Sequence, residues 1–295
     1  MARPNRYQIM ELYKNDIITE LNDLNDSVLS LTQVESVLSK NRNQWRLPNS
    51  TTLQQFLDYL IIKKKFLYAI EFGTSSRREK RYLYRKKEIN PISLGLSLYP
   101  NSYLSHFSAV MFHDLTDEII KSIYVNHEQS KKTKSDNKVI PQENIDLAFS
   151  KPMRSTNNYL DYNNQRIYII NGQYTGNLGI IERENIRCTD IERTLIDIAV
   201  RPQYSGGVFE VLNIFKKAKG EASVNRIAAY LKKLDYTYPY HQAIGFYLET
   251  AGYKENVLKL IENKFETKND FYLTSNIEDK SYNKRWRIYY PKNLQ

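Results

Sequence analysis

Residues 72–85, FGTSSRREKRYLYR, place five basic side chains among their last nine positions, behind a glycine turn. Cationic side chains at this density neutralise phosphates and release the counterions condensed on a nucleic acid. The preceding FLYAIEF run and the alternating tyrosines are typical of two strands joined by a turn. We therefore expect a hairpin whose basic residues lie along a polyanion. Those residues are Arg77, Arg78, Lys80 and Arg81.

The positive charge of the chain is concentrated around this hairpin. The formal net charge is +10 over 295 residues. Between Lys40 and Lys87, thirteen Lys and Arg residues face three acidic ones, Asp58, Glu71 and Glu79. This stretch alone equals the excess of the whole chain, which favours a nucleic-acid partner. The alternative is a basic face that contacts only solvent.

Two amphipathic helices are expected before the hairpin. Thr32 and Glu35 have the spacing of a capping box in front of a helix near 32–40. Thr51 and Gln54 repeat this pattern before a second helix, whose apolar residues follow the i, i+3, i+4, i+7 rule. Those apolar residues are Leu53, Phe56, Leu57, Leu60 and Ile61.

The opposite face of the second helix carries polar side chains of the kinds that read base edges or hold phosphates. The candidate DNA contacts are Thr51, Thr52, Gln54, Gln55, Tyr59 and Lys63. With a further helix near 5–24, the order of helices and hairpin is that of a winged helix-turn-helix. The NRNQWRLP segment between the two helices is longer than the usual turn, and Trp45 is expected to fill the core there.

We therefore predict an α+β chain with a winged helix-turn-helix DNA-binding domain over residues 1–95. A winged domain that binds protein or RNA is the alternative. Pro91 and Pro100 mark the boundary, and residues 96–295 are expected to form a mixed α/β domain with a helical C-terminal part. A helix is expected at SYLSHFSAVMFHDL, and strands at SIYVNHE, NIDLAFS, QRIYIIN and LGIIERENIRC.

Composition narrows the cellular setting. The chain is 41% hydrophobic and 26% charged, which is typical of a folded protein in water. The single cysteine, Cys188, leaves no internal disulfide framework and no cysteine pair for zinc. No run of about 18 apolar residues occurs, so we expect neither secretion nor membrane insertion but a cytoplasmic protein.

The segment TDIERTLIDIAVRP contains charged residues that invite a catalytic interpretation. Thr189 and Glu192 have capping-box spacing, and Arg193 and Asp197 are spaced for an ion pair along a helix. We expect these four residues to be structural, because each has a role in shaping a helix.

Signatures of enzymes are weak, so we expect no enzyme, no metal and no cofactor. The four histidines lack the HExxH spacing of a zinc site, and GQYTGNLG lacks the Lys-Ser/Thr of a phosphate-binding loop. A metal-dependent nuclease built on Asp146, Asp161 and Glu182 is the third hypothesis, since separated carboxylates can bind magnesium.

Four blocks behind the basic N-terminal region carry a resemblance to a known family: SYLSHFSAVMFHDLTDEIIKSIYV, IRCTDIERTLIDIAVRPQYSGG, HQAIGFYLETAGY and RWRIYYP. In this order they resemble the AbiEi family of antitoxins from type IV toxin-antitoxin systems, which act in abortive infection and phage defence. The resemblance covers nearly the whole chain. The long segment between the two helices, the basic loop at 130–138 and the extra N-terminal helix depart from the family pattern.

The resemblance implies a transcriptional repressor that binds inverted repeats in double-stranded DNA at its own promoter. It also implies a C-terminal domain that neutralises a cognate nucleotidyltransferase toxin, commonly without a stable complex. The alternative is a stand-alone winged-helix regulator whose C-terminal domain senses a protein or a ligand.

Overall fold

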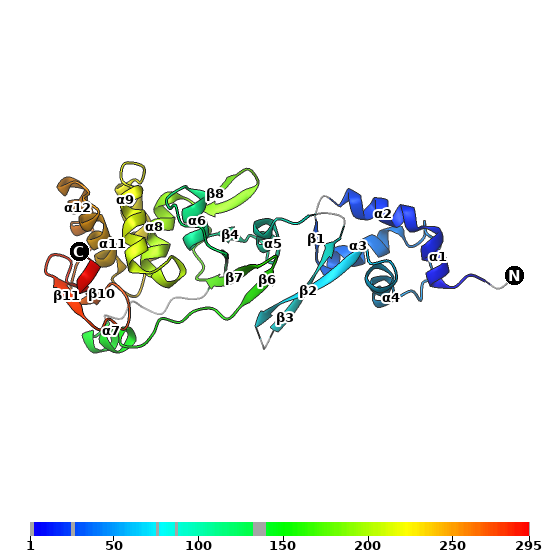
Figure 1. Cartoon of the computed structure of the whole chain (residues 1–295), viewed down its shortest axis with the longest axis horizontal. Coiled ribbons are helices and arrows are strands. Elements are labelled where there is room, and N and C mark those ends of the chain that lie inside the picture. Colours follow the sequence, from blue (N-terminus) through cyan, green and yellow to red (C-terminus); the bar gives the residue numbers. More distant parts are fainter. Residues whose placement is uncertain (1–2, 25–26, 75–76, 86–87, 132–139, 295) are drawn as a thin grey trace. The chain divides into compact units, whose positions relative to one another are not determined.

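The computed structural model describes residues 3–24, 27–74, 77–85, 88–131 and 140–294. Within them the chain is a mixed α+β protein with twelve α-helices and three sheets (Figure 1). It divides into two compact units. Residues 1–98 with 158–160 form the first unit, and residues 99–157 with 161–295 form the second. Each unit has its own hydrophobic core.

The first unit starts with three helices, α1 (Arg6–Leu12), α2 (Lys14–Asp23) and α3 (Leu31–Asn41). The capping box of α3 is formed by Ser30 and Gln33, because the Ser30 hydroxyl accepts from the Gln33 N–H and the Gln33 carboxamide accepts from the Ser30 N–H. The prediction of Thr32 and Glu35 as the capping pair is therefore wrong, although the helix itself is present.

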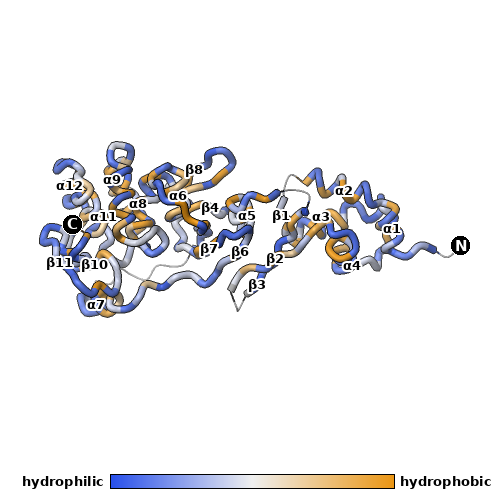
Figure 2. Tube along the Cα trace, in the orientation of Figure 1, coloured by the Kyte–Doolittle hydropathy of each residue, from blue (hydrophilic) through white to orange (hydrophobic). Residues whose placement is uncertain are grey.

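A helix and a small sheet complete the first unit. α4 (Leu53–Asp58) continues directly into the π-helical turn η1 (Tyr59–Lys63), and its hydrophobic residues appear orange in Figure 2. β2 (Leu67–Thr74) and β3 (Arg77–Tyr84) form an antiparallel hairpin. β1 (Val28–Leu29) pairs with β3, so the strand order is β1-β3-β2.

The cores of this sheet and of the α3–α4 connection are aromatic. Tyr82 and Tyr84 are buried and anchor the hairpin, as the sequence predicted. Trp45 is fully buried, with its ring 6.0 Å from that of Phe56, so it fills the core beneath the long connection as expected. α5 (Pro91–Ser97) ends the unit.

The second unit contains a six-stranded mixed sheet in the order β6-β7-β5-β4-β9-β8. β5 and β7 are parallel, β4 runs antiparallel to β5, and β8 and β9 form a hairpin. The strands are β4 (Tyr103–Leu104), β5 (Ser122–Glu128), β6 (Tyr159–Tyr162), β7 (Gln165–Gly172), β8 (Ile180–Arg183) and β9 (Ile186–Thr189).

Two expected elements in this unit differ from the structure. The NIDLAFS run lies in a helix, α7 (Gln142–Phe149), and is not a strand. Ile145 and Phe149 are buried four residues apart while Leu147 is exposed, which is the burial pattern of a helix. The SYLSHFSAVMFHDL run is divided between β4 and the short helix α6 (His106–Phe112).

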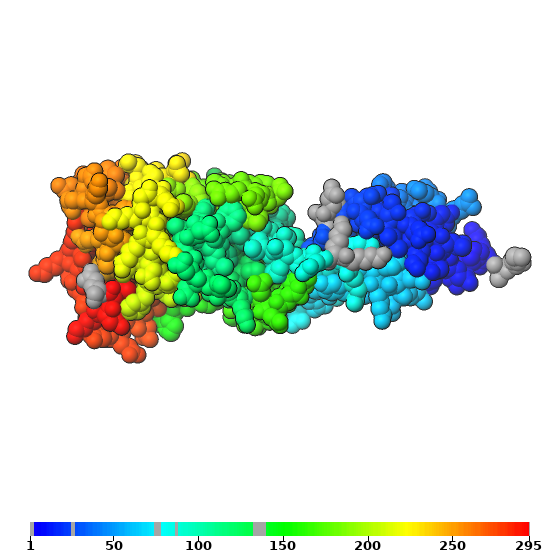
Figure 3. Space-filling model, turned by 45° about the horizontal axis from the view of Figure 1, so that its top comes forward, coloured from blue at the N-terminus to red at the C-terminus, as the bar shows by residue number. Residues whose placement is uncertain are grey.

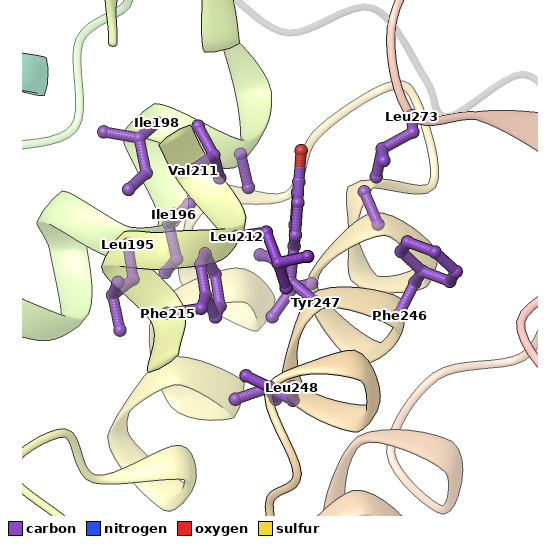
Figure 4. Packing of buried hydrophobic residues seen from close by; sticks show 14 of the residues in the cluster. Leu195, Ile196, Ile198, Val211, Leu212, Phe215, Phe246, Tyr247, Leu248 and Leu273 are labelled. Atoms are coloured by element: carbon purple, nitrogen blue, oxygen red, sulfur yellow. The ribbon is translucent and has the colours of Figure 1, made fainter. Parts of the chain in front are cut away.

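The C-terminal part of the second unit is helical, as predicted. Phe215 and Tyr247 stack at 5.0 Å between α9 and α11, and residues of α8 surround them (Figure 4). The surfaces of the later helices, yellow to orange, meet closely in Figure 3. The helices are α8 (Ile191–Val200), α9 (Val208–Lys217), α10 (Val224–Leu234), α11 (Tyr240–Thr250) and α12 (Glu255–Glu262).

A three-stranded sheet closes the chain. β12 (Ile288–Pro291) is its central strand, with β10 (Phe271–Tyr272) parallel to it on one side and β11 (Lys280–Asn283) antiparallel on the other. Two short 3₁₀ turns, η2 (Pro202–Tyr204) and η3 (Lys292–Leu294), follow α8 and β12.

Candidate nucleic-acid interface

The start of α4 is fixed by the side chains of Thr52 and Gln55. The Thr52 hydroxyl accepts from the Gln55 N–H, and the Gln55 carboxamide oxygen accepts from the Thr52 N–H at 3.0 Å. The predicted pair of Thr51 and Gln54 is wrong by one residue, because Thr51 is only 2% exposed and lies in the core. A capping box satisfies backbone donors and fixes the direction of the helix.

Three of the six predicted contacts on this helix are well exposed: Thr52, Gln54 and Lys63. Gln55 is half-buried, and Gln54 donates to the Asp58 carboxylate one turn later. Thr51 and Tyr59 are buried, so the structure corrects their prediction as direct contacts.

Tyr59 belongs to the core of the first unit. It is 1% exposed, and its hydroxyl donates to the Met10 carbonyl at 3.0 Å and to the Glu11 carboxylate at 3.3 Å. Burial, followed by the Glu11 charge, raises the pKa of its phenol. The residue therefore attaches η1 to α1 and does not face solvent.

Arg6 is a side chain at this surface that the sequence did not single out. Its Nη1 donates to the Gln55 carboxamide oxygen and, at 3.1 Å, to the Ser50 carbonyl. The only sequence signal is an arginine at the first position of a helix in a segment whose overall charge is negative. Arg6 thus brings a guanidinium to the exposed end of α4.

The lysines after η1 are held near α1. Lys63 Nζ lies 4.4 Å from the centre of the Tyr7 ring. Lys64 pairs with Glu11 and, as the largest cause, its hydrogen bond lowers the pKa of that carboxyl. Lys63 remains exposed, so its ammonium can still meet a phosphate.

The hairpin divides its basic residues into two kinds. Arg78 and Lys80 pair with Glu71 of the opposite strand at 3.6 and 3.0 Å, and all three side chains are exposed. The Lys80 hydrogen bond lowers the pKa of Glu71, and that bond raises the pKa of Lys80. Surface pairs of this kind contribute about 0–1 kcal/mol, so phosphates can compete for these cations.

Arg81 is of the second kind. Its side chain is 14% exposed, lies 5.1 Å from the Phe72 ring centre and donates to the Leu98 carbonyl. The structure therefore corrects its prediction as a phosphate contact at the tip, because its guanidinium stabilises the base of the hairpin. The side chain of Arg77 lies outside the described part of the structure.

The charged residues of the second unit form a buried network. The Nε of Arg193 donates to Asp197 at 2.8 Å, as the i, i+4 spacing predicted, and both side chains are less than 10% exposed. Asp190, not Thr189, caps α8 by accepting from the Arg193 N–H. Glu192 accepts from the N–H of Ser223, at the start of α10.

The expected capping box of Thr189 and Glu192 is therefore wrong. Thr189 lies at the end of β9, where its hydroxyl bonds that of Thr194 at 2.7 Å. Glu192 also pairs with Arg226, so it joins α8 to α10.

The glycine-containing loop after β7 holds a carboxylate of the chain itself. The backbone N–H groups of Thr175, Gly176 and Asn177 donate to Glu128 at 2.9 to 3.3 Å. Consecutive N–H groups of this kind form an anion-binding nest. Glu128 occupies it, and so fixes the loop to the end of β5.

The carboxylates of the nuclease hypothesis do not converge. Asp161 lies in β6 and Glu182 in β8, at opposite edges of the six-stranded sheet, and Asp146 lies in α7. Arg166 binds Asp161 through two hydrogen bonds of 2.7 and 3.0 Å. Among the described residues, no group of three His, Cys, Asp or Glu is placed to hold a metal.

A groove of about 810 Å³ lies in the second unit between α7, α10 and the segment after α12. His241 stacks on Phe265 at 5.1 Å within it, and burial lowers the pKa of His241 to about 4. The His241 Nε2 has no partner among the described residues. Other lining residues are Tyr236, Tyr238, Lys232 and Lys264.

The described helices are all too short or too polar to cross a membrane. No family model matches the sequence, and no curated protein does either. The structure is similar to the crystal structure of the RV2827C protein from Mycobacterium tuberculosis, with a TM-score of 0.60 and 12% sequence identity. The match covers 95% of this chain and 91% of that one, and at this identity it shows a shared fold.

Proposed function

We propose that the first unit is a winged helix-turn-helix that binds double-stranded DNA, and that the chain represses its own operon. The observation that carries this proposal is the packing of α3 and α4–η1 beside a β1-β3-β2 sheet whose hairpin carries the basic residues. In such domains the second helix enters the major groove and the hairpin lies along the sugar-phosphate backbone.

The exposed side chains fit this division of work. Thr52, Gln54 and Gln55 lie at the start of α4, where hydrogen-bonding groups would meet base edges. Arg78 and Lys80 lie exposed on the hairpin, and Lys63 is exposed at the end of η1. These cations would supply the sequence-independent part of the affinity.

The test is a fluorescence-anisotropy titration of the full chain on the duplex directly upstream of its own start codon, beside a scrambled duplex. Binding should be about 10³-fold tighter on the native duplex. Affinity for both duplexes should fall between about 50 and 200 mM salt. Equal affinity for the two duplexes would contradict sequence reading by α4.

For the second unit we propose toxin neutralisation, on the basis of the sequence blocks that resemble the AbiEi antitoxins. The test is co-expression with a nucleotidyltransferase encoded beside this gene, with growth as the readout. The full chain with Arg78 and Lys80 both changed to Glu should lose DNA binding and still restore growth. Growth arrest with both the wild-type chain and this variant would contradict the antitoxin role.

The groove near His241 favours a second candidate for this unit, a sensor for a small molecule. Its size lies within the range of ligand sites, about 300–1,000 Å³, and its walls combine aromatic rings with lysines. A chromosomal neighbourhood without a nucleotidyltransferase gene would favour this candidate. A metabolite mixture that shifts the affinity for the native duplex would support it directly.

A further inference from the structure

The hydrogen-bonding capacity of Gln55 is already half used. Its carboxamide oxygen accepts from the Thr52 N–H at 3.0 Å and from Arg6 Nη1. A carboxamide oxygen has two lone pairs, and these two donors account for both. Both partners can only donate, so they also fix which end of the carboxamide is oxygen and which is nitrogen.

Only donors therefore remain for a ligand at this place. The Gln55 Nε2 carries two N–H groups, and no acceptor for them is found among the described residues. Arg6 Nη1 is engaged by Gln55 and by the Ser50 carbonyl, while a guanidinium has five N–H groups in total. The two side chains lie in different helices, α1 and α4, and together they present N–H groups without a free acceptor.

The four bases differ in what they offer to such a donor pair. Guanine presents two neighbouring acceptors in the major groove, N7 and O6. Adenine pairs with glutamine through N7 and the N6 amino group, and the second of these contacts needs a free carboxamide oxygen. Cytosine presents the N4 amino group, which also needs an acceptor.

From this geometry we infer that Arg6 and Gln55 together select guanine at one position of the DNA site. The inference rests on the proposed DNA-binding function and adds the identity of a base to it. The usual glutamine–adenine pairing is blocked because Arg6 and Thr52 occupy the oxygen that it would use. A phosphate also accepts from such donors, and the experiment separates the two cases.

The experiment selects bound duplexes from a pool with a randomised centre, using the full chain. The expected consensus contains guanine at one fixed position. Replacing that guanine by 7-deazaguanine, which lacks the N7 acceptor, should weaken binding about 5- to 150-fold. Unchanged affinity on this analogue, or adenine at the position lost in the Gln55 variants, would overturn the inference.

The decisive variant is Gln55→Glu. A carboxylate keeps an oxygen for Thr52 and Arg6, so the cap is retained, while the free N–H groups are replaced by an acceptor. Preference at the one position should change from guanine to cytosine, whose N4 amino group pairs with carboxylates. Gln54→Glu, with the same charge change one residue earlier, should weaken binding to all sequences and leave the guanine in place.

Two further outcomes are distinct. If Gln55→Glu weakens all sequences equally and keeps the consensus, the donors contact phosphate and the inference is overturned while DNA binding stands. If no consensus emerges from the wild-type pool, the proposed function fails, and the inference fails with it. Circular dichroism of each variant confirms that α4 is still folded.

Discussion

The indole of Trp286 packs directly against the backbone of Gly245, so a Cβ at residue 245 would overlap the six-membered ring. Gly245 lies inside α11, and Trp286 is 1% exposed in the core of the second unit. Glycine inside a helix normally costs about 1 kcal/mol relative to alanine. Here the close approach of helix and indole explains the glycine.

Gly245→Ala is therefore expected to destabilise the second unit although it improves helix propensity. Overpacking of a filled core costs typically 1–3 kcal/mol, which outweighs the gain in propensity. Urea unfolding of the variant, followed by tryptophan fluorescence, measures this loss. In the double variant with Trp286→Leu the two effects should be strongly non-additive, whereas simple additivity would show that the indole is not the obstacle.

Arg285 is expected to stabilise the end of the second unit through three carboxylates. It pairs with Glu249, Glu255 and Glu262 at 2.7 to 3.0 Å and is 26% exposed. Arg285→Ala should lower the free energy of unfolding by about 1–2 kcal/mol, with a smaller loss at high salt. Arg285→Lys should restore only part, since an ammonium lacks the planar fork. A loss independent of salt would indicate packing instead.

Stability is expected to fall as the pH decreases from 6.5 toward 4. Burial lowers the pKa of His106 to about 4, against about 6.5 in the unfolded chain. Between these values the unfolded state binds more protons, so the contribution is complete above pH 6.5 and is lost as the pH falls. The loss at His106 should reach roughly 2–4 kcal/mol.

The matched variant is His106→Asn. His106 has a φ of 51°, and asparagine tolerates this left-handed region. Its pH dependence between 4 and 6.5 should be flatter than that of the wild type. His241, whose pKa is also about 4, keeps the remaining slope. Equal slopes in thermal unfolding of the two proteins would contradict the assignment to His106.

The two kinds of basic residue on the hairpin should separate in a salt titration. Changing Arg78 and Lys80 to alanine should reduce the slope of log affinity against log salt by about 2, because two phosphate contacts are lost. Arg81→Ala should lower stability and leave the slope nearly unchanged, since its guanidinium is held by Phe72 and Leu98. The opposite assignment of effects would place Arg81 on the DNA.

Apolar periodicity predicted the helices well, and local hydrogen bonding limited the prediction of the site. The stripe of Phe56, Leu57 and Leu60 is buried as expected. Tyr59 was placed on the polar face because a phenol suits both water and core, and only the distant Met10 carbonyl and Glu11 decide between them. Helix starts were misplaced by one or two residues, since several Ser, Thr and Asp side chains compete to cap each helix.

The contribution of Arg6 could not be predicted from the sequence. It lies 49 positions from Gln55 and meets it only through the packing of α1 beside α4. The NIDLAFS run shows the same limit, because its alternating apolar residues fit a strand until tertiary packing buries only Ile145 and Phe149.

The π-helical turn at Tyr59–Lys63 makes the length of this helix matter as much as its residue types. A π turn accommodates one residue more than an α turn, so it is the structural trace of a single inserted residue. Deleting one residue within the turn would rotate everything beyond it by about 100° around the axis. Ile62, which is 67% exposed, and Lys63 would then exchange their surroundings. Insertions and deletions in this segment can therefore redirect the end of the helix without changing the residues at its beginning.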